Sequence, residues 1–428
     1  MTTPGYFSFD ELQWWARADV PRIDQLPWVE WWDASALQLR PLTFNLWLVL
    51  SWAFAATPVA MHLMFVMFGS FNATLLAICL NRLGATSIVA IAAALVFTLS
   101  PFAVYTHGWT ATLADLLAVA LSLSAFLLAR LSCEYTDTVR RVALIAAVAL
   151  LTVLALLAKE SAVVLPALLI ASCWRARSRV PALAACAVAG AVVTIYLLVR
   201  WDALTKIDQQ AAAYAWSALN APARALEYLL FPFMPGLFEI APALAKSATR
   251  LVVAGLCLIA VAIAILRVSW RLCLAWLGLY LALLAPVLVL GISYNHYAYL
   301  ASTVFVAVPA LAWTRMPKVT SVVLATVALV SALHGVQVMI EMRTVGAIQN
   351  AFHENLVAVL SSAPNQPVSV GLESPADEWM LRRFLHDVPS YRGTSLASVS
   401  TVATSQSEAT HIMLRDGRLQ EVTAAERR

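Results

Sequence analysis

The chain has 428 residues, of which 61% are hydrophobic and 12% are charged, and its mean hydropathy is +0.79. Because soluble domains carry roughly a quarter of charged residues, this composition excludes an ordinary soluble protein and predicts an integral membrane protein. The net charge of +4 reflects basic residues in loops between apolar runs, so it does not indicate binding to nucleic acid. The six cysteines contain no CxxC spacing, and we expect no external disulfide framework.

Segment 1–56 mixes acidic and aromatic side chains. It contains seven tryptophans, and the acidic pair Asp10-Glu11 stands within the stretch FSFDELQWW. Tryptophan favours the membrane interface, where its ring is buried and its N–H group stays hydrated. We therefore expect short helices along the membrane surface, with the acids either solvated or part of a functional site.

Apolar runs close to the ~20 residues needed to cross a bilayer recur between residues 57 and 337. They predict an all-α polytopic bundle of about ten transmembrane helices. The expected spans are 57–80, 87–104, 110–129, 142–157, 161–174, 181–199, 250–266, 272–291, 298–313 and 319–337. The short spans within 142–174 are also compatible with a re-entrant pair.

The short loops predict the orientation, because lysine and arginine are retained on the cytoplasmic side. One alternating set of loops holds eleven basic residues, namely Arg82, Arg130, Arg140, Arg141, Arg175, Arg177, Arg179, Arg267, Arg271, Arg315 and Lys318. The opposite short loops, 105–109, 158–160 and 292–297, hold only Lys159. We therefore expect these three loops, segment 1–56, the long loop 200–249 and the tail to lie outside, in a bacterial plasma membrane protein.

The N-terminal segment lacks an apolar anchor of its own. Residues 1–40 are not preceded by a hydrophobic run, although the loop charges place them outside. We expect a first transmembrane helix before Met1, and the alternative is unaided translocation. The sequence does not identify what holds Asp10 and Glu11 over a site.

Several segments, in order, resemble the GT-C class of membrane glycosyltransferases, most closely its TMTC-type and protein O-mannosyltransferase-like branch. The resemblance extends from Asp10 to about residue 302. The segments that carry it are FSFDELQWW, LQLRPLTFNLWL, MHLMFVMFGSFNATLLAICLNRLG, TLSPFAVYTHGWTATLADLLA, LLAKESAVVLP and YNHYAYLAS. The resemblance implies transfer of a sugar from a polyprenyl-phosphate donor to an acceptor at the outer membrane face.

The resemblance also implies roles for individual residues. Asp10 is expected to be the general base that activates the acceptor, with Glu11 as its neighbour. Cationic and polar groups are expected around the donor phosphate, because they stabilise its developing charge. The candidates for this region are Arg40, His107, Asp115, Lys159, Glu160 and His296.

Simpler interpretations of these residues remain open. Asp10 can cap a helix, Glu160 can merely pair with Lys159, and Asp115 can organise His107 or Lys159. No metal ligands are identified, and dependence on a divalent metal is left open.

The chain also departs from the family pattern. Ser100-Pro101 stands where the family often has His-Pro, Leu113 replaces a common arginine, and Asn295-His296 replaces an acid followed by arginine. These departures keep two alternatives open: a transporter or flippase of lipid-linked sugars, and a catalytically inactive GT-C-like protein. The sugar and the acceptor, whether protein, lipid or polysaccharide, are not identified.

The composition becomes polar after about residue 338. We expect strands at QPVSVGLE and THIMLRDG, a helix at SPADEWMLRRFLHD and a loop at SLASVSTVATSQSEAT. The expected organisation is an external interfacial segment 1–56, a transmembrane bundle 57–337 and a small extracytoplasmic α/β tail 338–428. The external loop 200–249 is expected either to cover a lipid-linked donor or simply to pack on the bundle.

Overall fold

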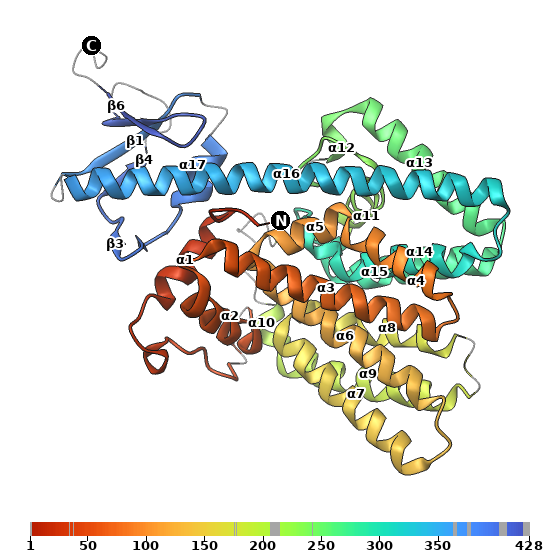
Figure 1. Ribbon diagram of the computed structural model, residues 1–428. Coiled ribbons are helices and arrows are strands. Elements are labelled where there is room, and N and C mark those ends of the chain that lie inside the picture. The colour runs from red at the N-terminus through yellow and green to blue at the C-terminus, as the bar shows by residue number, and fades with distance from the viewer. Residues whose placement is uncertain are drawn as a thin grey trace.

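The computed structural model shows a helical bundle joined to a small α/β unit (Figure 1). It describes residues 2–33, 35–36, 38–174, 176, 178–205, 215–241, 243–362, 366–374, 378–401 and 409–422. Arg175 and Arg177, which contribute to the charge pattern, lie outside these residues. So does most of the 402–410 part of the expected loop in the tail.

Among the described residues, eight helical segments are long and apolar enough to cross a membrane. They are α3 (Pro58–Arg82), α6 (Leu113–Ser132, extended by a 3-10 turn), α7 (Thr138–Ala158), α9 (Val180–Val199), α13 (Ala248–Leu266), α14 (Trp270–Leu288), α15 (Tyr299–Trp313, likewise extended) and α16 (Lys318–Ser362). The helices α4 (Ser87–Thr98) and α5 (Pro101–Gly108) follow each other with a bend of 62°, and such a pair is either one broken span or a re-entrant loop. By helix length and composition, the chain is a multi-pass membrane protein.

Nine of the ten expected spans correspond to these helices, and the span 161–174 corresponds to the shorter apolar stretch Glu160–Cys173. After α7 the backbone at Lys159 is extended, with φ −158° and ψ 133°. Residues Glu160–Cys173 then form only short turns around α8 (Leu165–Ile170). At 1.5 Å per residue this stretch covers about 21 Å, which is less than the ~30 Å hydrocarbon layer. It nevertheless runs between the two ends of α6, because Lys159 contacts Asp115 in the first turn of α6 and Trp174 contacts Arg130 in its last turn.

Local sequence signals account for where the spanning helices begin. The side chains of Thr86, Asp137, Ser247 and Ser269 accept hydrogen bonds from backbone N–H groups two or three residues further on. Such caps satisfy N–H groups that have no partner within the helix. Proline occupies the first turn of α3 and α5, where a missing N–H group costs nothing.

Helix α16 has 45 residues and is about 68 Å long, roughly twice the hydrocarbon thickness. The expected span 319–337 is only its first part. The helix continues to Ser362 because its later turns also have a buried side, which includes Val345, Phe352 and Leu356. The expected tail 338–428 therefore begins within this helix, and its first strand follows only after Ser362.

The tail contains a four-stranded sheet in the order β4-β1-β5-β6. Its strands are β1 (Val368–Leu372), β4 (Val399–Thr401), β5 (His411–Met413) and β6 (Leu419–Glu421). The central strand β1 is parallel to β4 and β5, while β6 is antiparallel to β5. The helix α17 (Glu378–Leu385) follows β1, and β2 (Ser390–Tyr391) pairs with β3 (Thr394–Ser395). The strands expected around β1 and β5 are confirmed, whereas β3 and β4 lie where a loop was expected.

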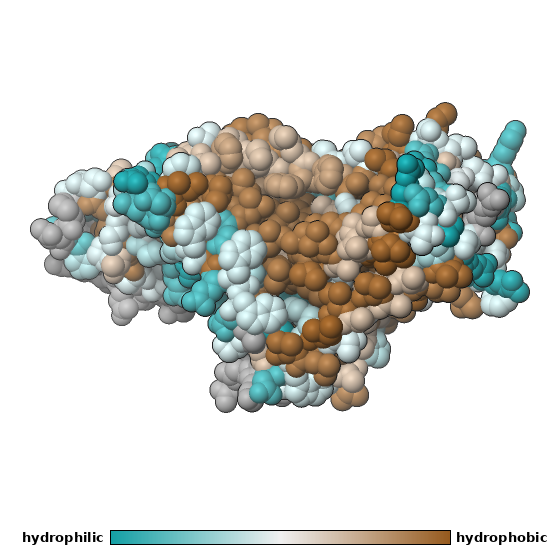
Figure 2. All heavy atoms as spheres, turned by 90° about the horizontal axis from the view of Figure 1, so that it is seen from below, coloured by the Kyte–Doolittle hydropathy of each residue, from teal (hydrophilic) through white to brown (hydrophobic). Residues whose placement is uncertain are grey.

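The remaining helices lie near the end of the bundle that carries the tail. They are α1 (Phe9–Ala18), α2 (Pro41–Phe54), α10 (Trp201–Thr205), α11 (Ala221–Leu230) and α12 (Ala243–Lys246), with the 3-10 turn η6 (Phe231–Phe233). Figure 2 shows a broad hydrophobic band between hydrophilic regions at the two ends of the molecule. This band is the part that a bilayer would surround.

The loops group at two ends as the charge pattern predicts. At one end Arg82 pairs with Glu134 at 2.9 Å, and Arg130 donates to the Trp174 carbonyl at 2.7 Å. At the other end the N-terminal segment contacts Thr110, and Trp109 contacts His296. The grouping is confirmed, while the assignment of the second end to the outside stays a prediction.

Replacing Gly335 by alanine tests the packing at the bend between α4 and α5. A Cβ atom at Gly335 would lie 1.9 Å from the Leu99 carbonyl oxygen, which is backbone and cannot rotate away. We expect Gly335→Ala to lower stability by about 1–3 kcal/mol or more. The matched control is Gly255→Ala in α13, where a Cβ meets nothing within 4 Å. Thermal unfolding in detergent measures both, and equal unfolding temperatures would contradict the packing.

Candidate active site

The helix α1 begins at Ser8, and its first turn carries both acidic residues. The Glu11 Oε2 atom accepts hydrogen bonds from the backbone N–H groups of Ser8 at 2.8 Å and Phe7 at 2.5 Å. The bond from the Ser8 N–H group is part of a capping box, in which the side chain of the third helical residue, Glu11, accepts from the backbone N–H of the capping residue. The sequence Ser-Phe-Asp-Glu therefore starts the helix and fixes its entry.

The other oxygen of Glu11 joins α1 to the bundle. Its Oε1 atom accepts hydrogen bonds from the backbone N–H and the hydroxyl of Thr110, both at 2.8 Å. Burial raises the pKa of Glu11 to about 7, although the hydrogen bonds from Thr110, Ser8 and Phe7 act in the opposite direction. Both oxygens are engaged, so this residue positions its neighbours.

The N-terminal segment is also held from the side of α16. The Tyr6 N–H group donates to Gln349 Oε1 at 2.6 Å, and the Tyr6 hydroxyl donates to the Ala55 carbonyl at 2.7 Å. His62 Nε2 lies 3.1 Å from the Gly5 carbonyl oxygen. These contacts supply the anchor for Asp10 and Glu11 that the sequence does not reveal.

Asp10 differs from Glu11 because its carboxylate is only half-buried. Its Oδ2 atom lies 3.5 Å from Ser8 Oγ, and the described residues provide no closer hydrogen bond to it. Burial raises the pKa of Asp10, and Ser8, Arg383 and His386 partly offset this effect. The result is an accessible carboxylate with an increased proton affinity.

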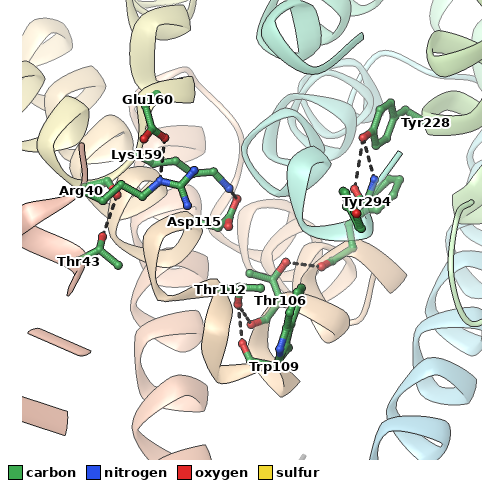
Figure 3. A network of polar contacts seen from close by, with 12 residues as sticks. Arg40, Thr43, Thr106, Trp109, Thr112, Asp115, Lys159, Glu160, Tyr228 and Tyr294 are labelled. Carbon is green, nitrogen blue, oxygen red and sulfur yellow. Dashed lines mark hydrogen bonds and ion pairs between the residues drawn. The ribbon is translucent and has the colours of Figure 1, made fainter. Parts of the chain in front are cut away.

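A second group of polar side chains consists of two ion pairs (Figure 3). Lys159 Nζ lies 2.5 Å from Asp115 Oδ1, and only 5% and 8% of these side chains are exposed. Arg40 Nε lies 2.7 Å from Glu160 Oε2. Arg40 precedes α2, Asp115 is in the first turn of α6, and the extended backbone at Lys159 directs this side chain inward.

The two ion pairs have no net charge, but some of their hydrogen-bonding atoms have no partner among the described residues. Within the described residues, Arg40 donates a hydrogen bond only through Nε, so its two terminal amino groups remain available. Glu160 Oε1 is buried and has no hydrogen-bond partner in the same part of the chain. Arg40 can therefore bind a further oxygen ligand without breaking its contact with Glu160.

His296 belongs to the 3-10 turn η7 (Asn295–Ala298) before α15. Asn295 fixes this turn, because its side chain accepts from the Ile240 N–H group and donates to the Phe238 carbonyl. The neighbouring Tyr297 places its ring 5.1 Å from Lys159 Nζ. His296 Nδ1 is buried without a partner in the described part of the chain.

Trp109 connects Asp10 to the ion pairs. Its indole N–H group donates to Ser8 Oγ at 2.9 Å, and its ring centre lies 5.2 Å from that of His296. His296 in turn contacts Tyr297, with 4.5 Å between ring centres. A continuous row of contacts thus leads from Asp10 to Lys159.

The structure places Arg40, Asp115, Lys159 and Glu160 in two ion pairs, and a row of contacts through Trp109 and His296 links these pairs to the segment of Asp10 and Glu11. His107 belongs to neither group. His107 is fully buried in α5, and its Nε2 atom lies 2.8 Å from the Tyr299 hydroxyl. It also packs against Gly69, where an added Cβ would lie 2.5 Å from the ring. These are helix–helix contacts. Asp115 was expected to organise either His107 or Lys159, and in the structure it pairs with Lys159.

Arg383 and Glu239 are residues of this region that sequence reasoning missed. Arg383 Nη2, from the tail, lies 2.8 Å from Glu239 Oε1, and the Tyr105 hydroxyl donates to the same oxygen at 3.2 Å. The guanidinium also lies 4.2 Å from the centre of the Phe7 ring. The tail helix was expected, but its sequence contains no signal for a contact with residues hundreds of positions earlier.

Among the described residues, no group of three or more His, Cys, Asp or Glu side chains is arranged to hold a metal ion. No model of a known protein family, no curated protein and no solved structure matches the chain. Any functional assignment therefore depends on the chemistry of the site itself.

The buried Glu11 predicts a pH dependence of stability. Its pKa is raised from 4.5 to about 7 in the folded state, so the native protein holds this proton more tightly than the unfolded chain. The contribution of Glu11 to stability is greatest below pH 4.5 and decreases as the pH rises towards about 7. When the carboxyl is protonated, the Thr110 hydroxyl can turn and accept its proton.

Glu11→Gln tests this prediction. The amide cannot ionise, so the part of the pH slope due to Glu11 should disappear. Overall stability should also fall by about 1–3 kcal/mol, because an amide nitrogen must face backbone N–H donors. The measurement is the unfolding temperature of both proteins between pH 4.5 and 8. An identical slope in the two proteins would rule out Glu11 as its source.

Proposed function

We propose that the chain is a membrane glycosyltransferase of GT-C type. It transfers a sugar from a polyprenyl-phosphate donor to an acceptor at the end of the bundle that carries Asp10. The observation that carries the proposal is an accessible carboxylate with a raised pKa, connected through Trp109 to a group that contains Arg40, Lys159 and His296. The resemblance of the ordered segments to that class supports the same function.

Asp10 serves as the general base in this proposal. It takes the proton from the acceptor hydroxyl or amide, the acceptor atom attacks the anomeric carbon of the sugar, and the bond from that carbon to the phosphate oxygen breaks. The polyprenyl phosphate leaves with the electron pair. A raised pKa suits a base that must accept a proton near neutral pH. Glu11 has no free oxygen and acts by holding Asp10 in place.

Arg40, Lys159 and His296 are proposed to bind the phosphate. The charge on the leaving oxygen grows as the sugar–phosphate bond breaks, and nearby cations and N–H donors stabilise it. Arg40 contributes its free terminal amino groups, and Lys159 contributes ammonium protons beside Asp115. His107, buried against Tyr299, has no role in this step.

An apolar cavity of about 440 Å³ is suited to part of the polyprenyl chain. It lies between α4, α13, α15 and α16 and reaches Pro232 and Phe233 in the loop before α12. Its lining is almost wholly hydrophobic, so a hydrocarbon chain would be stabilised there by removal of apolar surface from contact with water. In this proposal Pro232 and Phe233 of the loop 200–249 contact the polyprenyl chain.

One observation favours the alternative of a lipid-linked sugar transporter. Transporters bind their substrates at interrupted helices, and the 62° bend between α4 and α5 is such an interruption. In contrast, the charged groups described above lie at one end of the bundle. The role of Asp10 in transfer distinguishes the two functions.

Asp10→Asn should abolish sugar transfer without unfolding the protein. The amide keeps the size of the side chain but cannot act as a base, and within the described residues Asp10 makes a single long hydrogen bond. The glycan and glycoprotein profiles of cells with the intact protein, the variant and a deletion provide the measurement. Asp24→Asn is the matched control, because Asp24 is an exposed acid of the same segment.

Two outcomes of this experiment would contradict the proposal. If the variant profile matched that of the intact protein while the deletion differed, Asp10 would not be the base and a transporter would be favoured. If the deletion changed no glycan, the chain would have no transferase activity in those cells, as expected for an inactive relative.

Removing the Arg40 ion pair should weaken donor binding. The double variant Arg40→Gln/Glu160→Gln leaves no unpaired charge, yet it removes the guanidinium that we assign to the phosphate. We expect polyprenyl phosphate to bind about 10- to 100-fold more weakly, because a charge-assisted hydrogen bond is lost. Binding is measured by native mass spectrometry of the purified protein with added polyprenyl phosphate.

The matched control for this experiment is Arg82→Gln/Glu134→Gln. It removes an ion pair with a similar distance, 2.9 Å, at the opposite end of the bundle. An equal loss of affinity in the two double variants would show that the effect is not specific to the proposed site.

A further inference from the structure

A second apolar cavity lies towards the opposite end of the bundle, next to the short helix α8. Its volume is about 700 Å³, and it is enclosed by α3, α6, α8, α9, α14 and α15. Its lining reaches Leu83 at the end of α3 and Arg179 before α9. This is the end where Arg82 pairs with Glu134, away from Asp10.

The sequence explains why this space is not filled by the protein. The stretch Glu160–Cys173 contains only the short helix α8 between two 3-10 turns, so a regular transmembrane helix does not fill this position. The helices that face the space present small residues, namely Ala167, Ala171, Ala275, Gly278, Ala282 and Ala307. An unfilled apolar cavity of this size loses dispersion contacts and is costly to keep empty.

The cavity is open towards the lipid-facing surface. Ile170 and Leu183 belong to its lining, and 58% and 53% of these residues are exposed. Ile170 belongs to α8 and Leu183 to α9, and at this depth the surface of the bundle faces the hydrocarbon of the bilayer. An acyl chain can therefore enter from the side without crossing water.

The mouth of the cavity carries a cation. Arg179 is part of the lining, and its side chain makes no ion pair or hydrogen bond within the part of the chain that the structure describes. The nearby Arg130 donates to the carbonyls of Ser172 and Trp174, and thus fixes the wall beside Arg179. Arginine is well suited to bind a phosphate group.

We propose that this cavity binds an anionic phospholipid from the leaflet at this end of the bundle. One acyl chain fills the space between α8 and α14, and the phosphate of the headgroup contacts Arg179. The apolar lining and the free guanidinium at the mouth match the two parts of such a lipid. The inference is independent of the proposed transferase activity, because the site lies at the other end of the bundle.

Gly278→Leu tests the acyl-chain site. A Cβ atom at Gly278 meets nothing within 4 Å, so the leucine side chain can occupy the cavity without displacing the helices. The purified full chain is placed in nanodiscs with equal amounts of phosphatidylethanolamine and phosphatidylglycerol, and bound lipid is counted by native mass spectrometry. Wild type should retain phosphatidylglycerol, and the variant should retain it about tenfold less.

Gly255→Leu is the matched control. Its Cβ also meets nothing within 4 Å, but Gly255 does not line the cavity. This variant should retain lipid like wild type. Equal retention by the Gly278 and Gly255 variants, with both unfolding at the wild-type temperature, would overturn the proposal.

Arg179→Gln tests the headgroup contact separately and does not alter the cavity. The preference for phosphatidylglycerol over phosphatidylethanolamine should disappear, while an acyl chain is still bound. An unchanged preference would overturn the assignment of Arg179. Displacement of phosphatidylglycerol from wild type by added polyprenyl phosphate would also overturn the proposal, because the cavity would then belong to the donor site.

Discussion

The hydrogen bonds of Glu11 determine how the polar groups at the tail-bearing end of the bundle are arranged. One oxygen binds the backbone where α1 begins, and the other binds Thr110 at the start of the helix that carries Asp115. Because buried polar groups in a low-dielectric setting are costly to leave unpaired, this junction has a single favourable geometry. It therefore fixes Asp10 relative to the pair of Asp115 and Lys159, although no direct bond joins them.

The bilayer explains why irregular backbone occurs only in certain places. Within hydrocarbon each free N–H or carbonyl group needs a partner, so a helix can break only where side chains or neighbouring helices supply one. Ser100 supplies it at the bend of α4 and α5, and Gly335 lets α16 approach that bend closely. At Lys159 the break instead brings a charged side chain to Asp115. The two breaks thus have different consequences, close packing in one case and a buried ion pair in the other.

Hydropathy was sufficient to predict the eight long apolar helices and the grouping of loops, because both depend on the average environment of a segment. It did not predict the irregular backbone within 161–174 or the continuation of α16 through residues 338–362. Composition reports the surroundings of a segment and not its hydrogen-bond pattern. The individual roles of His107 and Arg383 depend on side-chain contacts between distant segments, which no local pattern contains.

The continuity of α16 gives the molecule a mechanical lever. Its first half belongs to the bundle, and its second half, about 37 Å long from residue 338 to 362, carries the tail. A 10° change in tilt would move the far end of that second half by about 6 Å. Gly346 of α16 lies against Thr3, and Gly5 lies against the Gly346 carbonyl. The second half of α16 is therefore in direct contact with the N-terminal segment that leads to Asp10. Tilting is one response of a long transmembrane helix to a change in hydrocarbon thickness. Through α16, that response would reach the segment that leads to this carboxylate.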